Sequence, residues 1–305
     1  MKIKSILALA AVAAMSLTSC CGKCDAGCTQ EKKEIGLQLY SVRNLMGQGQ
    51  AYENNLAALL DTLGKMGYTQ VEAANYNQGE GKFYGLTPEE YAKTAADAGI
   101  KVVSSHTGRT LNEAELKGGD LNDYYAWWDK CIKDHKAAGM KYIVLPWMNV
   151  PATIADLQKQ CEALNEVGHR AAAEGIKIGY HNHSHEFNKV EDVTMLDYMI
   201  EHTDADAVFF ELDVYWAMMG HASPVDYFTK YPGRFKLLHI KDRREIGQSG
   251  MVGFDAIFNN AEKAGVEGFF VEIEQFTDGA EKGTKESAEY LQNAPFVKAS
   301  YSVAE

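Results

Sequence analysis

Residues 171–187 read AAAEGIKIGYHNHSHEF, and this stretch holds one complete unit of the fold. The alanine-rich segment ends a helical pattern, and Gly175 suits the left-handed position that stops a helix. The run from Lys177 to His181 then has the length and apolar character of a buried strand. Histidines and a glutamate follow directly. The order predicts a helix, a tight turn, a buried strand and a polar strand end.

The same unit recurs on both sides of this stretch, at intervals of roughly 32 to 40 residues. This period is too long for leucine-rich repeats, and their asparagine ladder is missing. Eight strands are predicted, namely Ile35–Ser41, Gln70–Ala74, Lys101–Ser105, Tyr142–Pro146, Lys177–His181, Val208–Leu212, Lys236–Ile240 and Phe269–Glu272.

Amphipathic helical patterns lie between the strands, and several of them end in a small turn that contains glycine, such as Ala98-Gly99 and Ala138-Gly139. A helix that stops at glycine and leads into a buried strand is typical of repeated strand–helix units. The clearest helices are predicted at Tyr52–Met66, Pro88–Ala98, Leu121–Ala138, Ile154–Glu174 and Phe254–Ala264.

Eight such units in about 270 residues predict an α/β protein with a closed (β/α)8 TIM barrel as a single domain, residues 35–305. The competing fold, a doubly wound parallel sheet, usually carries a glycine-rich phosphate loop after its first strand. Residues 38–43 read QLYSVR at that point, without the GxGxxG pattern. The barrel is therefore the preferred prediction.

The first residues predict a targeting segment instead of part of the barrel. Lys2 and Lys4 precede an apolar run that is too short for a permanent membrane-spanning helix. The end of this run, Leu17-Thr18-Ser19-Cys20, resembles the lipobox of bacterial lipoproteins, which implies a signal peptide over residues 1–19 and lipidation of Cys20. Residues 20–34 then read as a flexible tether, and the protein is expected to be lipid-anchored in the bacterial cell envelope. A plain signal peptide that is cut nearby is the alternative.

Charge and cysteine placement exclude other classes. The chain has 30 Lys and Arg against 42 Asp and Glu, a net charge of −12, which argues against a general nucleic-acid binder. The four cysteines of the first 28 residues cluster at the expected anchor and tether, so they do not form a disulfide framework. Cys131 and Cys161 lie in helical patterns and are expected in the core.

Polar residues gather where the predicted strands end, and the chemistry of a TIM barrel lies at that end. The ends of strands five to eight carry carboxylates and imidazoles, and these strands are neighbours around a barrel. Carboxylates that converge there would repel one another unless a cation lay between them. A mixed oxygen and imidazole set predicts one divalent metal ion, Mn²⁺ or Mg²⁺ first and Co²⁺ or Zn²⁺ next. A salt-bridged rim without metal is the alternative.

Four short motifs together, HNHSHEF, ELDVYW, LLHIKD and FVEIEQ, resemble the xylose isomerase-like TIM barrel superfamily, the sugar phosphate isomerase/epimerase group. The resemblance covers roughly residues 35 to 295. It implies one divalent metal held by Asp213, His239 and Glu272, with one further ligand from the end of strand five. There the HNHxxEF form favours Glu186, with His181 as the alternative. Glu274 lies on the same strand face as Glu272 and is the alternative for that ligand.

A metal in such a site can polarise the carbonyl of an α-hydroxycarbonyl and acidify the neighbouring C–H. We therefore expect a sugar isomerase or epimerase that acts on a ketose or keto-sugar through an enediolate held by the metal. The candidate acid and base groups, which take the proton and return it, are Glu272, His183, Lys241 and His106.

The expected substrate is a small carbohydrate without phosphate, because no phosphate-binding glycine loop stands out and the envelope is a poor place for sugar phosphates. Aromatic and amide side chains near the strand ends are candidates for binding it. The candidate substrate-binding residues are His181, Asn182, Trp147, Trp216 and Gln38.

Three other functions are compatible with parts of the pattern. A lyase or hydratase of 3-keto-glycosides would use the same proton abstraction and then expel a β-oxygen. A non-catalytic sugar-binding lipoprotein is disfavoured because Asp213, His239 and Glu272 are all present. An AP-endonuclease-like DNA enzyme is disfavoured by the acidic charge and by the small number of His and Asp ligands.

Overall fold

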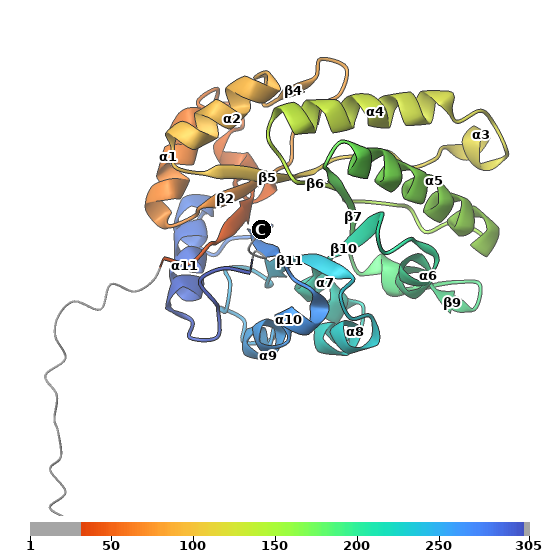
Figure 1. Ribbon diagram of the computed structural model, residues 1–305. Helices are drawn as coiled ribbons and strands as arrows, with labels where there is room; N and C mark the ends of the chain where they lie inside the picture. Colours follow the sequence, from red (N-terminus) through yellow and green to blue (C-terminus); the bar gives the residue numbers. More distant parts are fainter. Residues whose placement is uncertain (1–31, 302–305) are drawn as a thin grey trace, which may run out of the picture. The chain divides into compact units, whose positions relative to one another are not determined.

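A computed structural model describes residues 32–301. Its centre is a closed barrel of parallel strands in which the first strand lies between the last strand and the second (Figure 1). This arrangement confirms the predicted TIM barrel. In order around the barrel the strands are β1 (Gly36–Gln38), β12 (Gly268–Glu272), β11 (Phe235–Lys241), β10 (Val208–Asp213), β7 (Lys177–His181), β6 (Tyr142–Leu145), β5 (Lys101–His106) and β2 (Gln70–Ala73).

Helices surround these strands (Figure 1). Most of them bury apolar residues, although the one buried residue of the short α3 is Glu115. Several begin with a side-chain cap, as Thr87 does for α2 with a capping box. The described helices are α1 (Leu56–Met66), α2 (Pro88–Asp97), α3 (Glu113–Leu116), α4 (Asn122–Ala137), α5 (Ile154–Ala173), α6 (Met195–His202), α7 (Val214–Met219), α8 (Pro224–Lys230), α9 (Phe254–Asn259), α10 (Ala261–Ala264) and α11 (Ala280–Asn293).

The loops after two strands carry short hairpins. The pair β3 (Tyr76–Asn77) and β4 (Lys82–Phe83) follows β2, and the pair β8 (Lys189–Val190) and β9 (Val193–Thr194) follows β7. The loop after β7 also holds the 3-10 turn η2 (His185–Phe187).

Several boundaries differ from the sequence prediction, and the helix predicted over Tyr52–Met66 begins only at Leu56, after its cap Asn55. Strand one stops at Gln38, because the Gln38 side chain accepts a hydrogen bond from the Tyr40 backbone N–H and starts the 3-10 helix η1 (Leu39–Leu45). The predicted helix over residues 254–264 is two helices, α9 and α10, which are separated at Asn260. The early end of strand one matters for function, because residues 39–45 form η1 at the mouth of the barrel instead of continuing the strand.

The barrel interior is apolar at one end and polar at the other. Near the N-terminal strand ends, Gly36 and Gly179 leave room for the rings of Phe270 and Phe209, and a Cβ on either glycine would lie 2.4 Å from a ring atom. These rings fill the lower interior, as side chains do in TIM barrels. Two residues further along each strand, the inward positions are polar and charged. The polar end is therefore the C-terminal end of the barrel, where the predicted site lies.

A buried histidine outside that site gives a prediction on stability. His135 of α4 is fully buried, and its Nδ1–H donates to the Cys131 carbonyl over 2.7 Å. Burial lowers the pKa of His135 from 6.5 to about 4. As the pH falls from 6.5 towards 4, His135 becomes protonated in the unfolded chain but stays neutral in the folded protein. The stability present above pH 6.5 is therefore lost in that window.

At about 1.4 kcal/mol per pKa unit, His135 accounts for about 3 kcal/mol of the acid-induced loss in unfolding free energy. Urea unfolding of the parent and of His135→Gln at about pH 7.5 and about pH 4.5 measures this effect. The variant is expected to lose less stability than the parent between the two values. An equal loss in both proteins would contradict the assignment.

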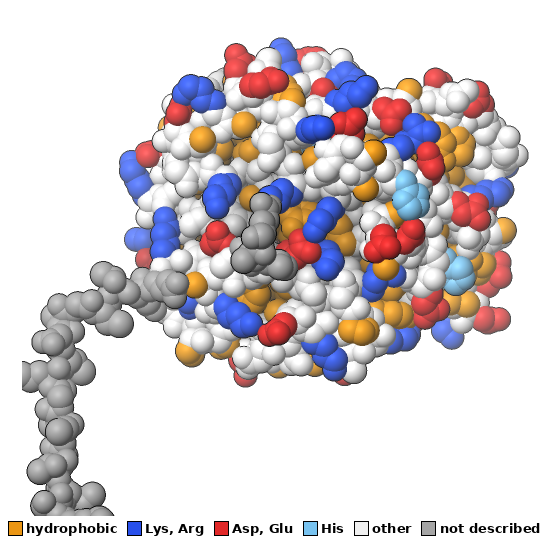
Figure 2. Space-filling view, viewed as in Figure 1, with side chains coloured by type: hydrophobic (Ala, Val, Ile, Leu, Met, Phe, Trp, Pro, Cys, Tyr) orange, Lys and Arg blue, Asp and Glu red, His pale blue; other side chains and the backbone are white. Residues whose placement is uncertain are grey.

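Lys and Arg side chains are interspersed with Asp and Glu over the face shown in Figure 2, so the acid surplus is not gathered there. Among residues 32–301, no helix has the length and apolar character that crossing a membrane requires. The predicted signal peptide and the lipidation at Cys20 lie outside the described residues.

Candidate active site

Four neighbouring strands bring His181, Asp213, His239 and Glu272 together at the polar end of the barrel. These residues end β7, β10 and β12 or lie within β11, and each is at most 5% exposed. Each offers one ligand atom, and the four atoms lie within 4.8 Å of one another. The strand register explains the cluster, because Asp213 pairs with His239 and Lys241 pairs with Glu272 on the adjacent strands.

The donor set of this cluster fits a cation. Asp213 Oδ2 and His239 Nδ1 are buried and have no hydrogen-bond partner among the described residues. Burial raises the pKa of Asp213 to about 7, with Lys241 opposing this effect and the nearby Glu272 carboxylate adding to it. Unpaired buried polar atoms are costly, and a divalent cation held by Asp213 and by deprotonated His239 would satisfy both atoms. Two carboxylates with two imidazoles are a common ligand set for first-row divalent metals.

Asp213 is held in place from two sides. Its Oδ1 accepts the Trp216 backbone N–H over 2.7 Å and so caps α7, which leaves Oδ2 unpaired. The buried Asn182 accepts the Asp213 backbone N–H over 3.1 Å and donates to the His183 carbonyl over 3.2 Å. Asn182, predicted to bind substrate, thus joins the ends of β7 and β10 and positions Asp213.

Two further carboxylates, Glu72 and Glu211, form a floor beneath the cluster, and both are fully buried. His239 Nε2 lies 2.7 Å from a Glu72 oxygen and 3.2 Å from a Glu211 oxygen. His181 Nδ1 lies 3.2 Å from the same Glu211 oxygen. Each of these histidines therefore turns one ring nitrogen to the floor. The other nitrogen is left for a ligand, as in carboxylate–histidine–metal triads.

His106, a predicted acid–base residue, belongs to this floor. Its Nε2 lies 2.7 Å from Glu211 and 3.1 Å from Glu72, and its ring stacks on His239. Although burial opposes the charge, the two carboxylates raise the pKa of His106. Its polar edge is thus occupied by protein carboxylates, which gives it a positioning role.

Gln38, a predicted substrate-binding residue, also lies in the floor. Its amide donates to Glu72 over 2.8 Å, and Ser104 donates to the other Glu72 oxygen over 2.5 Å. Neither Glu72 nor Glu211 was among the site residues predicted from the sequence. Their sequence positions could have indicated a role, because both acids occupy inward strand positions, where a buried charge is costly without partners.

Lys241 lies beside the cluster and is almost fully buried. Its ammonium is 3.2 Å from Glu272 and 3.0 Å from Glu274. Burial alone would lower the pKa of Lys241, but Glu272, Asp213 and Glu274 raise it instead. Glu274, the alternative ligand, thus pairs with Lys241 at the rim and lies outside the four-residue cluster.

His183 lies above the cluster with the two predicted substrate-binding tryptophans. Its ring centre is 4.9 Å from that of Trp147 and 5.8 Å from that of Trp216, and its buried Nδ1 has no partner among the described residues. Burial lowers the pKa of His183 to about 4, so the ring is neutral. Trp216 also lines a cavity of about 150 Å³ with Lys241 and Glu274. Trp147 is 51% exposed and forms an open aromatic edge of the site.

Glu186, the predicted fourth ligand, is not brought together with Asp213, His239 and Glu272. It lies in η2, where it accepts hydrogen bonds from the Tyr180 hydroxyl over 2.6 Å and the His183 backbone N–H over 2.8 Å. Its ligand atoms group with those of His183 and His185 instead. The arrangement favours His181, the alternative named from the sequence, as the fourth ligand.

Comparison with known proteins identifies the family and the fold. A family model described as xylose isomerase-like TIM barrel matches residues 60–294. A solved structure of a sugar phosphate isomerase/epimerase from Parabacteroides distasonis is 35% identical and superposes with a TM-score of 0.80. The match covers 89% of this chain and 98% of that one.

The other matching proteins have lower sequence identity or cover less of the chain. An inosose dehydratase of Geobacillus kaustophilus is 22% identical over 66% of this chain, and the inosose dehydratases that match are covered over 26% to 66% of their own lengths. The IOLI protein, solved with a bound zinc atom, is 16% identical with a TM-score of 0.65. The match covers 85% of this chain and 97% of that one, which shows a shared fold.

Proposed function

The chain belongs to the xylose isomerase-like TIM barrel family and is an enzyme, and we propose that it is a metal-dependent isomerase or epimerase of a ketose or keto-sugar. The observation that carries the proposal is the buried cluster of His181, Asp213, His239 and Glu272, in which Asp213 Oδ2 and His239 Nδ1 have no hydrogen-bond partner among residues 32–301. The similarity to a sugar phosphate isomerase/epimerase over nearly the whole barrel supports the reaction class.

The proposed cofactor is one divalent cation, with Mn²⁺ or Mg²⁺ first and Co²⁺ or Zn²⁺ next. His181, Asp213, His239 and Glu272 would hold it, and when bound it would supply Lewis-acid polarisation of a substrate carbonyl. His181 suits this role because burial and the neighbouring histidines lower its pKa well below the usual range, which keeps the imidazole neutral. His239 would release a proton on binding the metal, because Glu211, Glu272 and Glu72 raise its pKa against the effect of burial.

His183 and Lys241 are the proposed proton-transfer residues. His183 is neutral with an unpaired Nδ1, so it can accept the proton from the carbon next to the carbonyl. Lys241 is charged, so its ammonium can stabilise developing negative charge on the substrate or donate a proton. A pair of groups whose pKa values are pushed apart is the usual arrangement of a base and an acid.

A lyase reaction is the second candidate, and the inosose dehydratase relatives favour it. Elimination starts with the same proton abstraction by His183, and Lys241 would then protonate the departing β-oxygen. The two reactions need the same residues at their first step. Isomerisation returns the proton to carbon, whereas elimination forms a C=C bond and releases water or an alcohol.

The substrate, on this proposal, is an unphosphorylated carbohydrate. Glu272 and Glu274 already pair with Lys241, so protein carboxylates neutralise the ammonium beside the metal cluster. We also propose that the barrel is lipid-anchored through Cys20 in the cell envelope, where the substrate would be captured. Radiolabelled palmitate incorporation into the parent and not into Cys20→Ser would test the anchor.

Deuterium exchange tests the proposed function. The residue 32–305 barrel, loaded with Mn²⁺, is incubated in D₂O with common ketohexoses and with 3-keto-glucosides. Deuterium is expected at the carbon next to the carbonyl, because His183 would exchange the abstracted proton with solvent. Nuclear magnetic resonance measures the exchange, and the products distinguish isomerisation from elimination. A metal-loaded protein that exchanged no deuterium with any of these substrates would contradict the proposal.

A further inference from the structure

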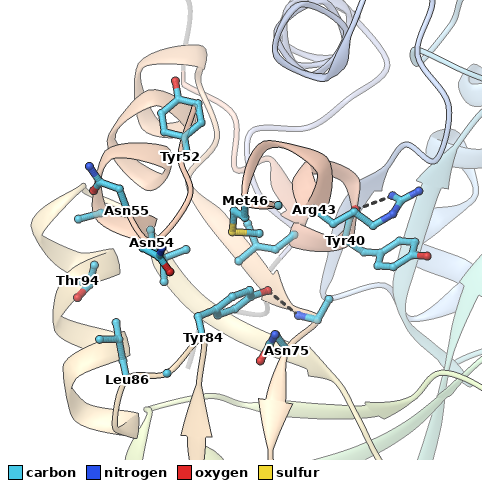
Figure 3. Close-up of a pocket in the computed structure, with 16 residues that line it drawn as sticks. Tyr40, Arg43, Met46, Tyr52, Asn54, Asn55, Asn75, Tyr84, Leu86 and Thr94 are labelled. Carbon is cyan, nitrogen blue, oxygen red and sulfur yellow. Dashed lines mark hydrogen bonds between the residues drawn. The ribbon is translucent and has the colours of Figure 1, made fainter. Parts of the chain in front are cut away.

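A cavity of about 750 Å³ lies beside the mouth of the barrel (Figure 3). Its walls come from η1, from the start of α1, from the segment after β2, and from α2. None of the residues proposed to hold metal lines it. The volume falls within the range of about 300 to 1,000 Å³ that is usual for ligand pockets.

The cavity opens at the same end of the barrel as the metal cluster. Tyr40 and Asn75 line it, and each lies two residues beyond the end of its strand, β1 or β2. Because all strands of a parallel barrel end on the same face, these residues lie on the catalytic face. The cavity is thus an extension of that face and not a feature of the opposite end.

Arg43 connects the cavity to the site. Arg43 lines the cavity, and its guanidinium donates to the Tyr40 carbonyl over 2.7 Å and to the Glu274 carbonyl over 3.4 Å. The Glu274 carboxylate in turn lies 3.0 Å from the Lys241 ammonium. One bonded chain of residues therefore runs from the cavity wall to the charged group beside the metal cluster.

The lining suits a polyhydroxy ring, to which Arg43 adds a cationic hydrogen-bond donor. Tyr40 is 45% exposed, with the Arg43 guanidinium 3.8 Å from its ring centre, and Tyr84 and Tyr52 add further aromatic surface. Asn54 and Asn75 present exposed amides, and the lining contains no carboxylate. Aromatic faces pack on the C–H face of a sugar, and amides exchange hydrogen bonds with its hydroxyls.

The cavity also holds unusual backbone. Asn54 and Tyr84 have positive φ angles of 55° and 52°, and they are two of the four such non-glycine residues among residues 32–301. The Tyr84 hydroxyl accepts the Ala74 backbone N–H over 2.9 Å, which fixes this tyrosine against the end of β2 (Figure 3). Strained residues that surrounding contacts hold in place are concentrated at ligand sites.

We propose that this cavity is a second carbohydrate subsite, which binds a sugar ring linked to the ring that carries the reacting carbonyl. The inference rests on the proposed function and narrows it, since the substrate becomes a two-ring carbohydrate or glycoside instead of a free monosaccharide. Tyr40 and Arg43 lie between the two positions, where the linkage would pass.

Filling the cavity tests this subsite. Ala57 is exposed on α1 and lines the cavity, so Ala57→Trp occupies the space without removing a buried contact. Isothermal titration calorimetry compares glucose with cellobiose, maltose, sucrose and trehalose. The parent is expected to bind at least one disaccharide about tenfold more tightly than glucose, the gain that one additional stacked ring supplies. Ala57→Trp is expected to lose this gain, and Ala172→Trp, an exposed alanine of α5 away from the cavity, to keep it.

Asn75→Leu is a second variant, which removes an exposed amide and leaves the cavity open. It is expected to weaken disaccharide binding and to leave glucose binding unchanged. A parent that bound no disaccharide more tightly than glucose, or an Ala57→Trp protein that bound disaccharides like the parent, would overturn the subsite. Failure of the proposed function has a different signature, because absence of deuterium exchange leaves the sugar-binding measurements intact.

Discussion

The Asp213→Asn variant is expected to lose its metal and at least about a thousandfold of its deuterium-exchange rate, because a bound cation supplies several kcal/mol of charge stabilisation. The substitution is chosen because Asn retains the acceptor that caps α7 at Trp216. It removes only the negative charge and the unpaired Oδ2 that faces His239 and Glu272. Metal content by mass spectrometry and exchange by nuclear magnetic resonance are the two measurements.

Asp120→Asn is the matched control, because Asp120 is exposed and also accepts a backbone N–H two residues later, at Asn122. This control is expected to keep both metal and exchange. An Asp213→Asn protein with full metal content would show that Asp213 is no ligand. One that lost its metal and kept its exchange rate would show that the reaction does not depend on the cation.

The Glu211→Gln variant is expected to bind the metal about 10- to 100-fold more weakly, the usual cost of removing a carboxylate that orients ligating histidines. Glu211 is fully buried, and one of its oxygens lies 3.2 Å from both His181 Nδ1 and His239 Nε2. Gln has nearly the same shape but no negative charge, so its amide oxygen holds the two rings more weakly than the shared carboxylate oxygen does. Competition with a fluorescent chelator measures the dissociation constant.

Glu267→Gln is the control for this variant, because Glu267 is a partly buried glutamate that directly precedes β12, at the opposite end of the barrel. It binds Lys177 over 2.8 Å and Tyr142 over 2.7 Å. Its loss is expected to lower the free energy of unfolding without changing metal affinity. If Glu211→Gln gave the same result, Glu211 would be a structural residue without a role in orienting the metal ligands.

The sequence predicts the barrel well because barrel strands repeat a local pattern. All eight predicted strands overlap strands of the barrel, and the strand predicted over Lys177–His181 has the same bounds as β7. The error at the first strand has a side-chain cause, since Gln38 bonds the Tyr40 backbone and bends the chain into η1. Propensity alone does not reveal such a bond, because it depends on a single rotamer.

The sequence predicts the candidate site less completely. Asp213, His239 and Glu272 follow from strand ends and from the family resemblance, and the structure brings them together. Glu186 lies five residues beyond the end of β7, in a loop, where spacing does not determine the direction of a side chain. The hydroxyl of Tyr180, which points outward from the barrel strand into the same region, captures that carboxylate.

The sequence by itself determined the repeat, the order of the strands and the alternation that sends every second strand residue inward, because these depend on neighbours along the chain. The tertiary structure decided which inward residues share a centre. Glu211 meets His181, and Asp213 meets His239, only through the register between adjacent strands. The cavity beside Tyr40 likewise exists only where η1, α1 and α2 meet. Contacts between distant segments depend on how the barrel closes, and a local sequence pattern does not determine this closure.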